Sequence, residues 1–224
     1  MALPDGWTIV TDYEKPDADL VAAFQDVETG PAGDALGRSA AMDAAIKPIV
    51  VGLKLFGTAV TVATRPCDNL ACYKALDLAG PGDVLVIAVK DYPTHSVWGD
   101  LTSQIAMTKG LAGVVTDGMV RDIVGLTEVG LPVFARGLTP NSPQKDGPAQ
   151  INVPIVCGGM VVHPGDIILG DSDGVVVIPR NRALEVLEKV KEIARKEAGI
   201  RESIRNRGGL PDSAIEMLKA KGLM

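Results

Sequence analysis

Four polar residues that could bind and activate a small organic acid each come shortly after an apolar run typical of a buried strand: Asn69, Asp100, Arg121 and Asp122. Open α/β sheets bind ligands beyond the carboxyl ends of their strands, so we expect these side chains to converge there. Arg121 would bind an anionic substrate, and Asp122 would hold a metal ion. The amide of Asn69 would hydrogen-bond to a keto or carboxylate oxygen.

Each of these residues also has a plainer interpretation. Arg121 and Asp122 could form a charge pair within a helix, or Asp122 could be favoured by the helix dipole. Asp100 could serve as a helix N-cap, and Asn69 could cap the helix that follows it. If Asp100 does open a helix, the amides of Leu101 and Thr102 become donors able to hold a carboxylate. The spacing alone leaves both interpretations open.

Other kinds of chemistry find little support in the sequence. Neither the G-x-G-x-x-G nor the G-x-x-x-x-G-K-S/T nucleotide motif is present, and two histidines are too few for the usual zinc sites. His95 lies in a loop after a strand, near Tyr92 and Trp98, where it could touch a substrate or simply be exposed. His163 precedes Pro164 and Gly165, which predicts a turn. Carboxylates, arginines and backbone amides remain as the candidate functional groups.

The composition narrows the class of protein further. The 22 Lys and Arg residues against 28 Asp and Glu residues give a net charge of 22 − 28 = −6, which disfavours a nucleic-acid surface. The chain is 46% apolar, enough for a sizeable core in 224 residues. The three cysteines form no C-x-x-C motif and are expected to be reduced packing residues. No signal peptide or membrane span is visible, so we expect a cytoplasmic protein.

Short apolar runs bounded by Gly, Pro, Asp or Asn predict most of the strands. The expected strands are Leu53–Thr64, Asp83–Val89, Gly113–Thr116, Pro132–Ala135, Ile151–Val156, Ile167–Leu169 and Val175–Ile178. Helices are expected as pieces within 18–45, broken by Gly30, Pro31 and Gly33, and at Leu70–Ala79, Leu101–Lys109 and Val120–Val129. The earlier strands alternate with helices, as in βαβ units, whereas the later strands are joined only by turns. The sequence therefore predicts an α/β fold with a mixed sheet, in which residues 170–174 form a hairpin turn.

The C-terminal part has a different pattern. Residues 181–207 predict a long charged helix with a thin apolar stripe of Leu184, Leu187, Val190 and Ile193. So narrow a stripe favours packing on a neighbouring element or subunit. A last short helix is expected from Asp212 to Lys221.

Eight segments of the chain, taken together, resemble one known family. They are GDALGR at 33–38, IKP at 46–48, GTAVTV at 57–62, DNL at 68–70, PGDVLV at 81–86, WGDL at 98–101, GVVTDGMVRD at 113–122 and PGDIILGDSDGVVVIP at 164–179. The family is that of the 4-hydroxy-4-methyl-2-oxoglutarate and 4-carboxy-4-hydroxy-2-oxoadipate aldolases, which share a fold with the regulator of ribonuclease activity A. The resemblance runs in order from about residue 18 to about residue 205.

The resemblance implies a fold and an assembly. The fold would be a swivelling β/β/α-type single domain spanning 1–224, with a core at 18–179 and a helical extension at 180–224 for subunit contacts. The assembly would be a homotrimer or homohexamer whose active sites lie between subunits. Its partners would be a small 2-oxo acid and copies of itself, with no nucleic acid and no membrane.

The resemblance also implies a reaction: divalent-metal-dependent (class II) retro-aldol cleavage that releases pyruvate in aromatic compound catabolism, with oxaloacetate decarboxylase side activity. Asp122 would ligate Mg²⁺ or Mn²⁺. Arg121, Asn69 and the amides of Leu101 and Thr102 would bind the pyruvyl group. Asp100 would position the water that carries a proton. A glutamate of a neighbouring subunit would complete the outer metal shell, with Glu197 as the candidate.

Two rival functions remain at this point. The same fold serves a non-catalytic regulator that binds an RNA-degrading enzyme, but such regulators tend to lack the acidic residue that this chain has as Asp122. A class I aldolase would instead use a lysine Schiff base, for which Lys90 at a strand end is the candidate. The natural substrate and its acceptor half cannot be deduced from these residues.

Overall fold

The computed structural model describes residues 3–224 and shows a mixed α/β domain with a long C-terminal helix. Its main sheet has nine strands, seven of them in the order β1-β10-β3-β4-β6-β8-β2, with the β13–β14 hairpin joined through β3. These strands are β1 (Thr8–Ile9), β2 (Lys47–Pro48), β3 (Leu55–Thr64), β4 (Asp83–Ala88), β6 (Gly113–Thr116), β8 (Val133–Ala135), β10 (Ala149–Ile151), β13 (Ile167–Asp171) and β14 (Gly174–Ile178). The expected mixed sheet is therefore confirmed.

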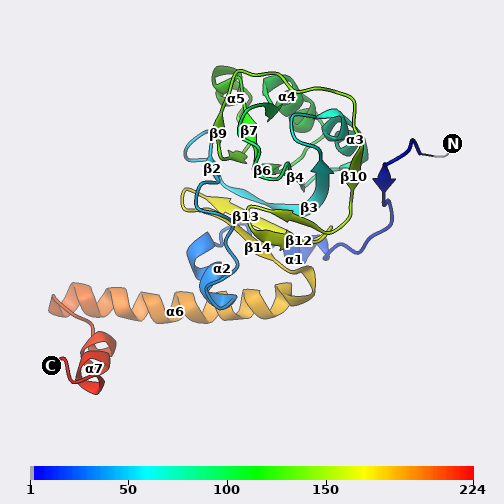
Figure 1. Cartoon of the computed structure of the whole chain (residues 1–224). Helices are drawn as coiled ribbons and strands as arrows, with labels where there is room; N and C mark the ends of the chain where they lie inside the picture. Colours follow the sequence, from blue (N-terminus) through cyan, green and yellow to red (C-terminus); the bar gives the residue numbers. More distant parts are fainter. Residues whose placement is uncertain (1–2) are drawn as a thin grey trace.

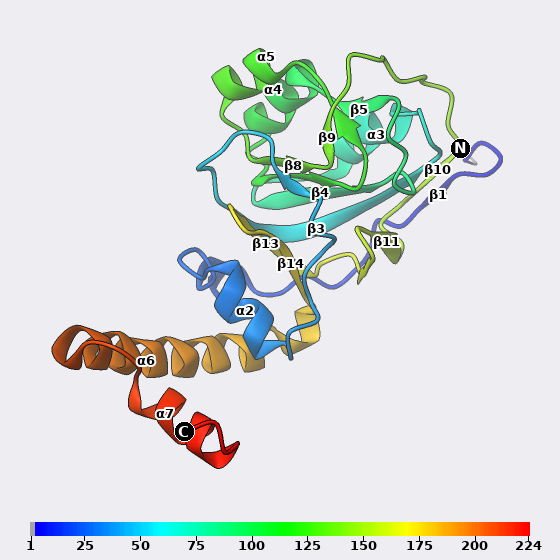
Figure 2. The ribbon, with the colours of Figure 1, turned by 60° about the vertical axis from the view of Figure 1, so that its left-hand side comes forward.

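Four parallel strands, β3, β4, β6 and β8, form the part of the sheet that leads to the candidate site. The helices α3 (Leu70–Leu78), α4 (Asp100–Thr108) and α5 (Ile123–Val129) cover one face of this sheet (Figure 2). Aliphatic side chains such as Val60, Leu85 and Val114 fill the space between these helices and the sheet. The predicted βαβ alternation is correct, although α5 begins three residues later than expected.

A second, smaller sheet was not predicted. It consists of β5 (Ser96–Trp98), β7 (Met119–Val120) and β9 (Gly137–Leu138), which run parallel in that order. Each follows one main-sheet strand, so β4, β6 and β8 are continued by β5, β7 and β9. Strands of two or three residues are too short to show a hydrophobic periodicity, so they could not be predicted from the sequence. The turn at 117–118 leads into β7, and only then into a helix.

The opposite face of the molecule carries the β13–β14 hairpin and the remaining helices. The predicted turn is confirmed, because Asp171 pairs with Gly174 across the hairpin end. Alternate side chains of the hairpin face the main sheet, as Ile168 does, or face α2 (Thr29–Ala35) and α6 (Ala183–Arg207), as Ile167 does. Both faces are buried, which explains why the two runs are continuously apolar.

The long helix α6 differs from its predicted stripe at one residue. Leu184 is exposed, whereas Val186 is fully buried beside Leu187 and Val190, because these three residues lie on the side of α6 that packs against α2 and β14. The later half of α6 extends beyond the body, and α7 (Asp212–Ala220) follows it (Figure 1). Within 3–224 no helix is both long and apolar enough to cross a membrane.

The predicted strand Ile151–Val156 is wrong, because the chain turns within it. Asn152 has a φ of 57°, which ends β10 and redirects the chain into β11 (Ile155–Cys157). Within residues 3–224 the strand β11 pairs only with β12 (Met160–Val162). The helices α1 (Ala18–Ala22) and α2 confirm that 18–45 holds helical pieces, but the expected breaks at Gly30, Pro31 and Gly33 are wrong, because α2 runs through all three residues.

Candidate active site

A cavity of about 150 Å³ opens where the small sheet meets the starts of α3 and α4. The six predicted binding residues of this region all line it: Asn69, Asp100, Leu101, Thr102, Arg121 and Asp122. The sequence did not single out the other lining residues, apart from Trp98; these are Tyr73, Ser96, Gly99, Ser142, Pro143 and Lys145. Three separate segments, the starts of α3 and α4 and the turn between β7 and α5, thus bring these six residues to one place.

The start of α4 supplies the backbone donors of the cavity. Gly99, not Asp100, is the N-cap residue, and its amide donates to the Thr102 hydroxyl at 3.0 Å. The Leu101 amide donates to the Oδ1 atom of Asp100 at 2.6 Å and is therefore already engaged. Within the described chain the Thr102 amide has no acceptor, as expected for the first turn of a helix. Thr102 is thus the better placed of the two predicted amide donors.

Arg121 and Asp122 face the cavity at the end of β7. The Nε atom of Arg121 donates to Oδ2 of Asp122 at 3.1 Å, and its Nη1 atom donates to the Ser142 hydroxyl at 2.6 Å. Asp122 has the left-handed φ of 65° and caps α5 by position, without a side-chain hydrogen bond to the helix. The interpretation as a charge pair inside a helix is therefore wrong, since both residues precede α5.

Glycines at two contact points allow these side chains to approach one another. A Cβ atom at position 99 would lie 2.6 Å from Oδ2 of Asp122, and one at position 125 would lie 2.6 Å from the Cβ of Asp100. Real Cβ contacts are essentially never so short. Gly99 therefore makes room for the Asp122 carboxylate, and Gly125 makes room for the Asp100 side chain.

Asn69 lies almost completely buried at the floor of the cavity, 5% exposed. Its Nδ2 atom donates to the Val97 carbonyl at 3.2 Å, which leaves one N–H without an acceptor, while its buried Oδ1 atom has no partner among the described residues. Asn69 is the N-cap residue of α3 by position, as one alternative expected, but its side chain makes no hydrogen bond to the helix, and the Leu70 amide donates to Oδ1 of Asp68 at 2.9 Å. A buried amide with unused hydrogen-bonding capacity is expected where a ligand binds.

Several residues considered from the sequence lie away from this cavity. Glu197 lies on α6 and accepts from Arg201 at 2.9 Å; its predicted role concerns a neighbouring subunit and stays a prediction. Lys90 is exposed and does not line the cavity; the cavity lysine is Lys145, whose Nζ lies 5.4 Å from the Tyr73 ring centroid. His95 stacks on Tyr92 outside the cavity.

The donor set of the cavity is suited to a hard divalent cation. Asp122 places one carboxylate at the cavity, and within the described residues its Oδ1 atom accepts no hydrogen bond. Mg²⁺ needs only one or two protein carboxylates, because waters and substrate oxygens complete its shell. Within residues 3–224, no group of three or more His, Cys, Asp or Glu side chains is placed so that it could hold a metal ion.

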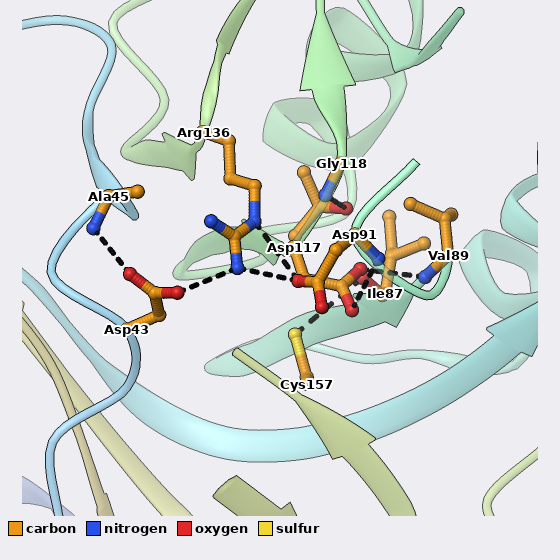
Figure 3. A network of polar contacts seen from close by, with 10 residues as sticks. Asp43, Ala45, Ile87, Val89, Asp91, Asp117, Gly118, Arg136 and Cys157 are labelled. Carbon is orange, nitrogen blue, oxygen red and sulfur yellow. Dashed lines mark hydrogen bonds and ion pairs between the residues drawn. The ribbon is translucent and has the colours of Figure 1, made fainter. Parts of the chain in front are cut away.

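A second arginine, Arg136, follows β8 in the way that Arg121 follows β7 (Figure 3). Its Nη2 atom donates to Asp43 at 2.9 Å and to Asp91 at 2.6 Å. The neighbouring Asp117 is 2% exposed, and this burial raises the pKa of its carboxyl group despite an amide donated by Val89 at 2.7 Å. Burial also raises the pKa of the Cys157 thiol well above its ordinary value. This cluster does not line the cavity.

Comparison with known proteins shows a consistent family. The model of the RraA-like family, described as Aldolase/RraA, matches residues 19–177. A protein of Halalkalibacterium halodurans named "Putative 4-hydroxy-4-methyl-2-oxoglutarate aldolase" is 41% identical over 174 residues, 78% of this chain and 83% of its own length. A Thermus thermophilus protein named "4-hydroxy-4-methyl-2-oxoglutarate aldolase" is 35% identical over 112 residues, 50% of this chain and 68% of its own length.

Solved structures of the same family are similar to this chain. The structure of Streptomyces coelicolor RraAS2 superimposes with a TM-score of 0.76 and 28% identity, covering 84% of this chain and 99% of the other. It is described as an unusual member of the RNase ES inhibitor RraA protein family. Aldolase names and regulator names therefore both occur among the similar proteins.

Proposed function

Because the chain belongs to the RraA-like family, Aldolase/RraA, we propose that it is a lyase that releases pyruvate by class II retro-aldol cleavage. The substrate would be a 4-hydroxy-2-oxo dicarboxylic or tricarboxylic acid, and oxaloacetate would be decarboxylated as a side reaction. The observation that supports this most is the convergence of Arg121, Asp122, Asp100, Asn69 and the Thr102 amide on one cavity.

The residues divide the work of binding the pyruvyl group. The unused Thr102 amide at the positive end of α4 would hold its carboxylate. Arg121, with donors beyond those given to Asp122 and Ser142, would place positive charge beside the keto oxygen, where negative charge develops as the C–C bond breaks. The second N–H of Asn69 would bind the same end of the substrate.

Asp122 would hold Mg²⁺ or Mn²⁺, which would supply Lewis-acid chemistry at the keto oxygen of the substrate and so favour departure of the pyruvyl half when the C–C bond breaks. Asp100 would hold the water that receives and returns the proton, since its Oδ2 atom lies at the cavity and accepts no hydrogen bond within the described chain. Decarboxylation of oxaloacetate requires stabilisation of the same developing charge. One site therefore accounts for both activities.

Lys145 supports the choice of a substrate with more than one carboxylate. It places a second cation at the cavity, on the wall formed by residues 142–145, in addition to Arg121. A monocarboxylic 2-oxo acid needs one cationic partner, whereas a 4-carboxylated substrate would use both.

Exposed apolar side chains around the cavity support the proposal that copies of this chain assemble over it. Leu101 and Val124 are 66% and 70% exposed, and the neighbouring Ile105, Ile123 and Leu138 are also exposed. Such a patch around a polar cavity is typical of a surface that a protein partner covers. A trimer or hexamer with sites between subunits would bury it and would bring a glutamate such as Glu197 from a neighbour.

The regulator interpretation is the second candidate, because similar structures carry that description. A regulator needs no metal-binding carboxylate, and Asp122 together with the space that Gly99 leaves for it favours the enzyme. The class I interpretation has less support, since Lys90 does not line the cavity.

The test is release of pyruvate from oxaloacetate and from 4-hydroxy-4-methyl-2-oxoglutarate, with Mg²⁺ and with excess EDTA. Asp122→Asn should abolish turnover, while the matched control Asp91→Asn, an arginine-paired carboxylate outside the cavity, should keep it. Turnover that survives EDTA, or Asp122→Asn as active as the control, would contradict the proposal. An inactive wild-type protein would favour the regulator.

A further inference from the structure

One wall of the cavity is a loop segment, residues 142–147, that we call the strap. It lies in the long connection between β9 and β10 (Figure 1). Ser142, Pro143 and Lys145 of the strap line the cavity, and the Ser142 hydroxyl accepts from Nη1 of Arg121 at 2.6 Å. The position of the strap therefore determines where the arginine is held.

The carboxylate of Asp68 connects the strap to the opposite wall. Its side chain is 0% exposed, and its Oδ2 atom accepts from the amides of Asp146 at 2.7 Å and Gly147 at 3.1 Å. Its Oδ1 atom accepts from the Leu70 amide at 2.9 Å, at the start of α3. One buried carboxylate thus fixes the far end of the strap to the helix that follows Asn69.

Backbone hydrogen bonds continue this connection next to Asp68. The Asn69 amide donates to the Gln144 carbonyl at 3.0 Å, and the Gln144 amide donates to the Cys67 carbonyl at 2.7 Å. Arg65 lies 3.3 Å from Asp68 and 3.0 Å from Asp146. Burial alone would raise the pKa of the Asp68 carboxyl, but the three amides and Arg65 outweigh it and lower that pKa. Asp68 is therefore an anion at neutral pH.

We infer that Asp68 is a positioning residue for the proposed reaction: it holds the strap so that Ser142 orients the Arg121 guanidinium toward the substrate. Asp68 does not line the cavity and therefore acts through the residues that it holds in place. This inference rests on the proposed function for its kinetic consequence, but its structural consequence can be measured on the protein without substrate.

The variant Asp68→Asn keeps the shape of the side chain but replaces one accepting oxygen by an amino group that faces backbone donors. At least one of the three hydrogen bonds from the amides of Leu70, Asp146 and Gly147 is then lost, and a donor is left unsatisfied in a buried place, which weakens the link between the strap and α3. Hydrogen exchange of peptides covering 142–147 should become about tenfold faster, while exchange in α6 stays the same. The control Asp77→Asn changes an exposed carboxylate that pairs with Lys74 outside the strap and should leave strap exchange unchanged.

Oxalate, a dianion that resembles the pyruvyl enolate, serves as the binding probe in the presence of Mg²⁺. The expected loss of affinity in Asp68→Asn is about tenfold, the value typical of one hydrogen bond to a charged group. With oxaloacetate, kcat should fall by a similar factor while KM changes less than about threefold, because a displaced guanidinium loses its contact with the charge that develops only in the transition state.

A double-mutant cycle distinguishes positioning from a general loss of stability. Ser142→Ala removes the exposed hydroxyl that Arg121 binds, and should itself weaken oxalate binding. In the Asp68→Asn background, Ser142→Ala should have little further effect, because the two changes act through the same contact. Should Asp68→Asn fail to fold, Asp68→Glu, which keeps the charge but shifts it by one methylene, takes its place.

Additive effects of the two substitutions, or unchanged strap exchange in Asp68→Asn, would overturn the inference. Exchange and oxalate binding do not depend on turnover. A protein that cleaves no 2-oxo acid, yet shows faster strap exchange and non-additive loss of oxalate binding, would sustain the positioning role while contradicting the proposed reaction.

Discussion

Arg121 and Arg136 occupy equivalent places in the chain but have different surroundings. Each comes directly after a strand at the carboxyl-terminal side of the parallel sheets. Arg136 donates to two carboxylates, Asp43 and Asp91, and these pairs raise the pKa of its guanidinium although burial opposes this. Arg121 donates to one carboxylate and one hydroxyl, and its side chain borders a cavity.

The difference shows how this fold separates structural from functional charge. Arg136 neutralises two aspartates from segments far apart in the sequence, so both of its partners are carboxylates of the chain itself. Arg121 has one carboxylate and one hydroxyl as partners, and Asp122 keeps one oxygen that accepts no hydrogen bond within the described residues. Residue type and position after a strand are the same in both cases. The distinguishing feature is the number of carboxylates that the chain itself places against each guanidinium.

The largest effect on activity is expected when Arg121 is replaced, and the replacement of Arg136 provides the comparison. Arg121→Ala should lower kcat/KM for oxaloacetate by about 10²–10³, the usual loss for one charge-stabilising donor, with the unfolding temperature nearly unchanged. Arg136→Ala should keep most of the activity and lower the unfolding temperature by about 2–4 °C, because its ion pairs are partly exposed. Equal losses of activity in both variants would remove the distinction.

Asp100→Asn should have the next largest effect, on kcat rather than on KM. The substitution keeps the acceptor for the Leu101 amide but removes the base that holds the water, so kcat should fall by about 10². Gly125→Ala gives an independent check, since its added methyl group would displace Asp100. A rise in KM alone in Asp100→Asn would contradict the proton-carrying role.

Lys145→Met should have a smaller effect that depends on the substrate. Affinity for 4-hydroxy-4-methyl-2-oxoglutarate, which has two carboxylates, should fall about tenfold, whereas affinity for pyruvate, which has one, should change less, because only the dicarboxylic acid uses both cations. Lys74→Met is the control, since Lys74 pairs with Asp77 outside the cavity. Equal changes in affinity for both acids would show that Lys145 does not select the substrate.

The smallest effect concerns Asp117 beside Arg136. Its folded-state pKa lies above the ordinary value of about 3.9, so the folded protein binds this proton more tightly than the unfolded chain. The resulting stability is complete below about pH 3.9 and is lost as the pH rises through the folded-state pKa. In urea unfolding, Asp117→Asn should therefore gain stability relative to wild type between about pH 4 and pH 7. A difference independent of pH would contradict this.

Much of this fold could be predicted from periodicity. Buried runs such as Gly113–Thr116 and the β13–β14 hairpin have clear boundaries, and α6 has a long charged pattern. The small sheet could not be predicted, because β7 has two residues. The apolar spacing places Leu184 in the stripe of α6, and only the packing of α6 against α2 shows that Val186 is buried and Leu184 is exposed.

Residues of the candidate site could be predicted where a polar side chain able to bind an anion or a metal follows a predicted strand. Asn69, Asp100, Arg121 and Asp122 follow strands, and their types indicate anion and metal binding. Ser142 and Lys145 could not be found in this way, because a loop without periodicity reaches the cavity through long-range contacts to Asp68. Glu197 stays a prediction, since its role depends on a neighbouring subunit.

The central claim is that the cavity at Arg121 and Asp122 activates the pyruvyl group. The most direct test is exchange of pyruvate methyl protons in D₂O, followed by NMR, with Mg²⁺ and the wild-type, Arg121→Lys and Arg136→Lys proteins. The account predicts exchange catalysed by the wild-type and Arg136→Lys proteins, strongly reduced in Arg121→Lys and absent with EDTA. Exchange at the same rate in Arg121→Lys, or none with the wild-type protein, would contradict it.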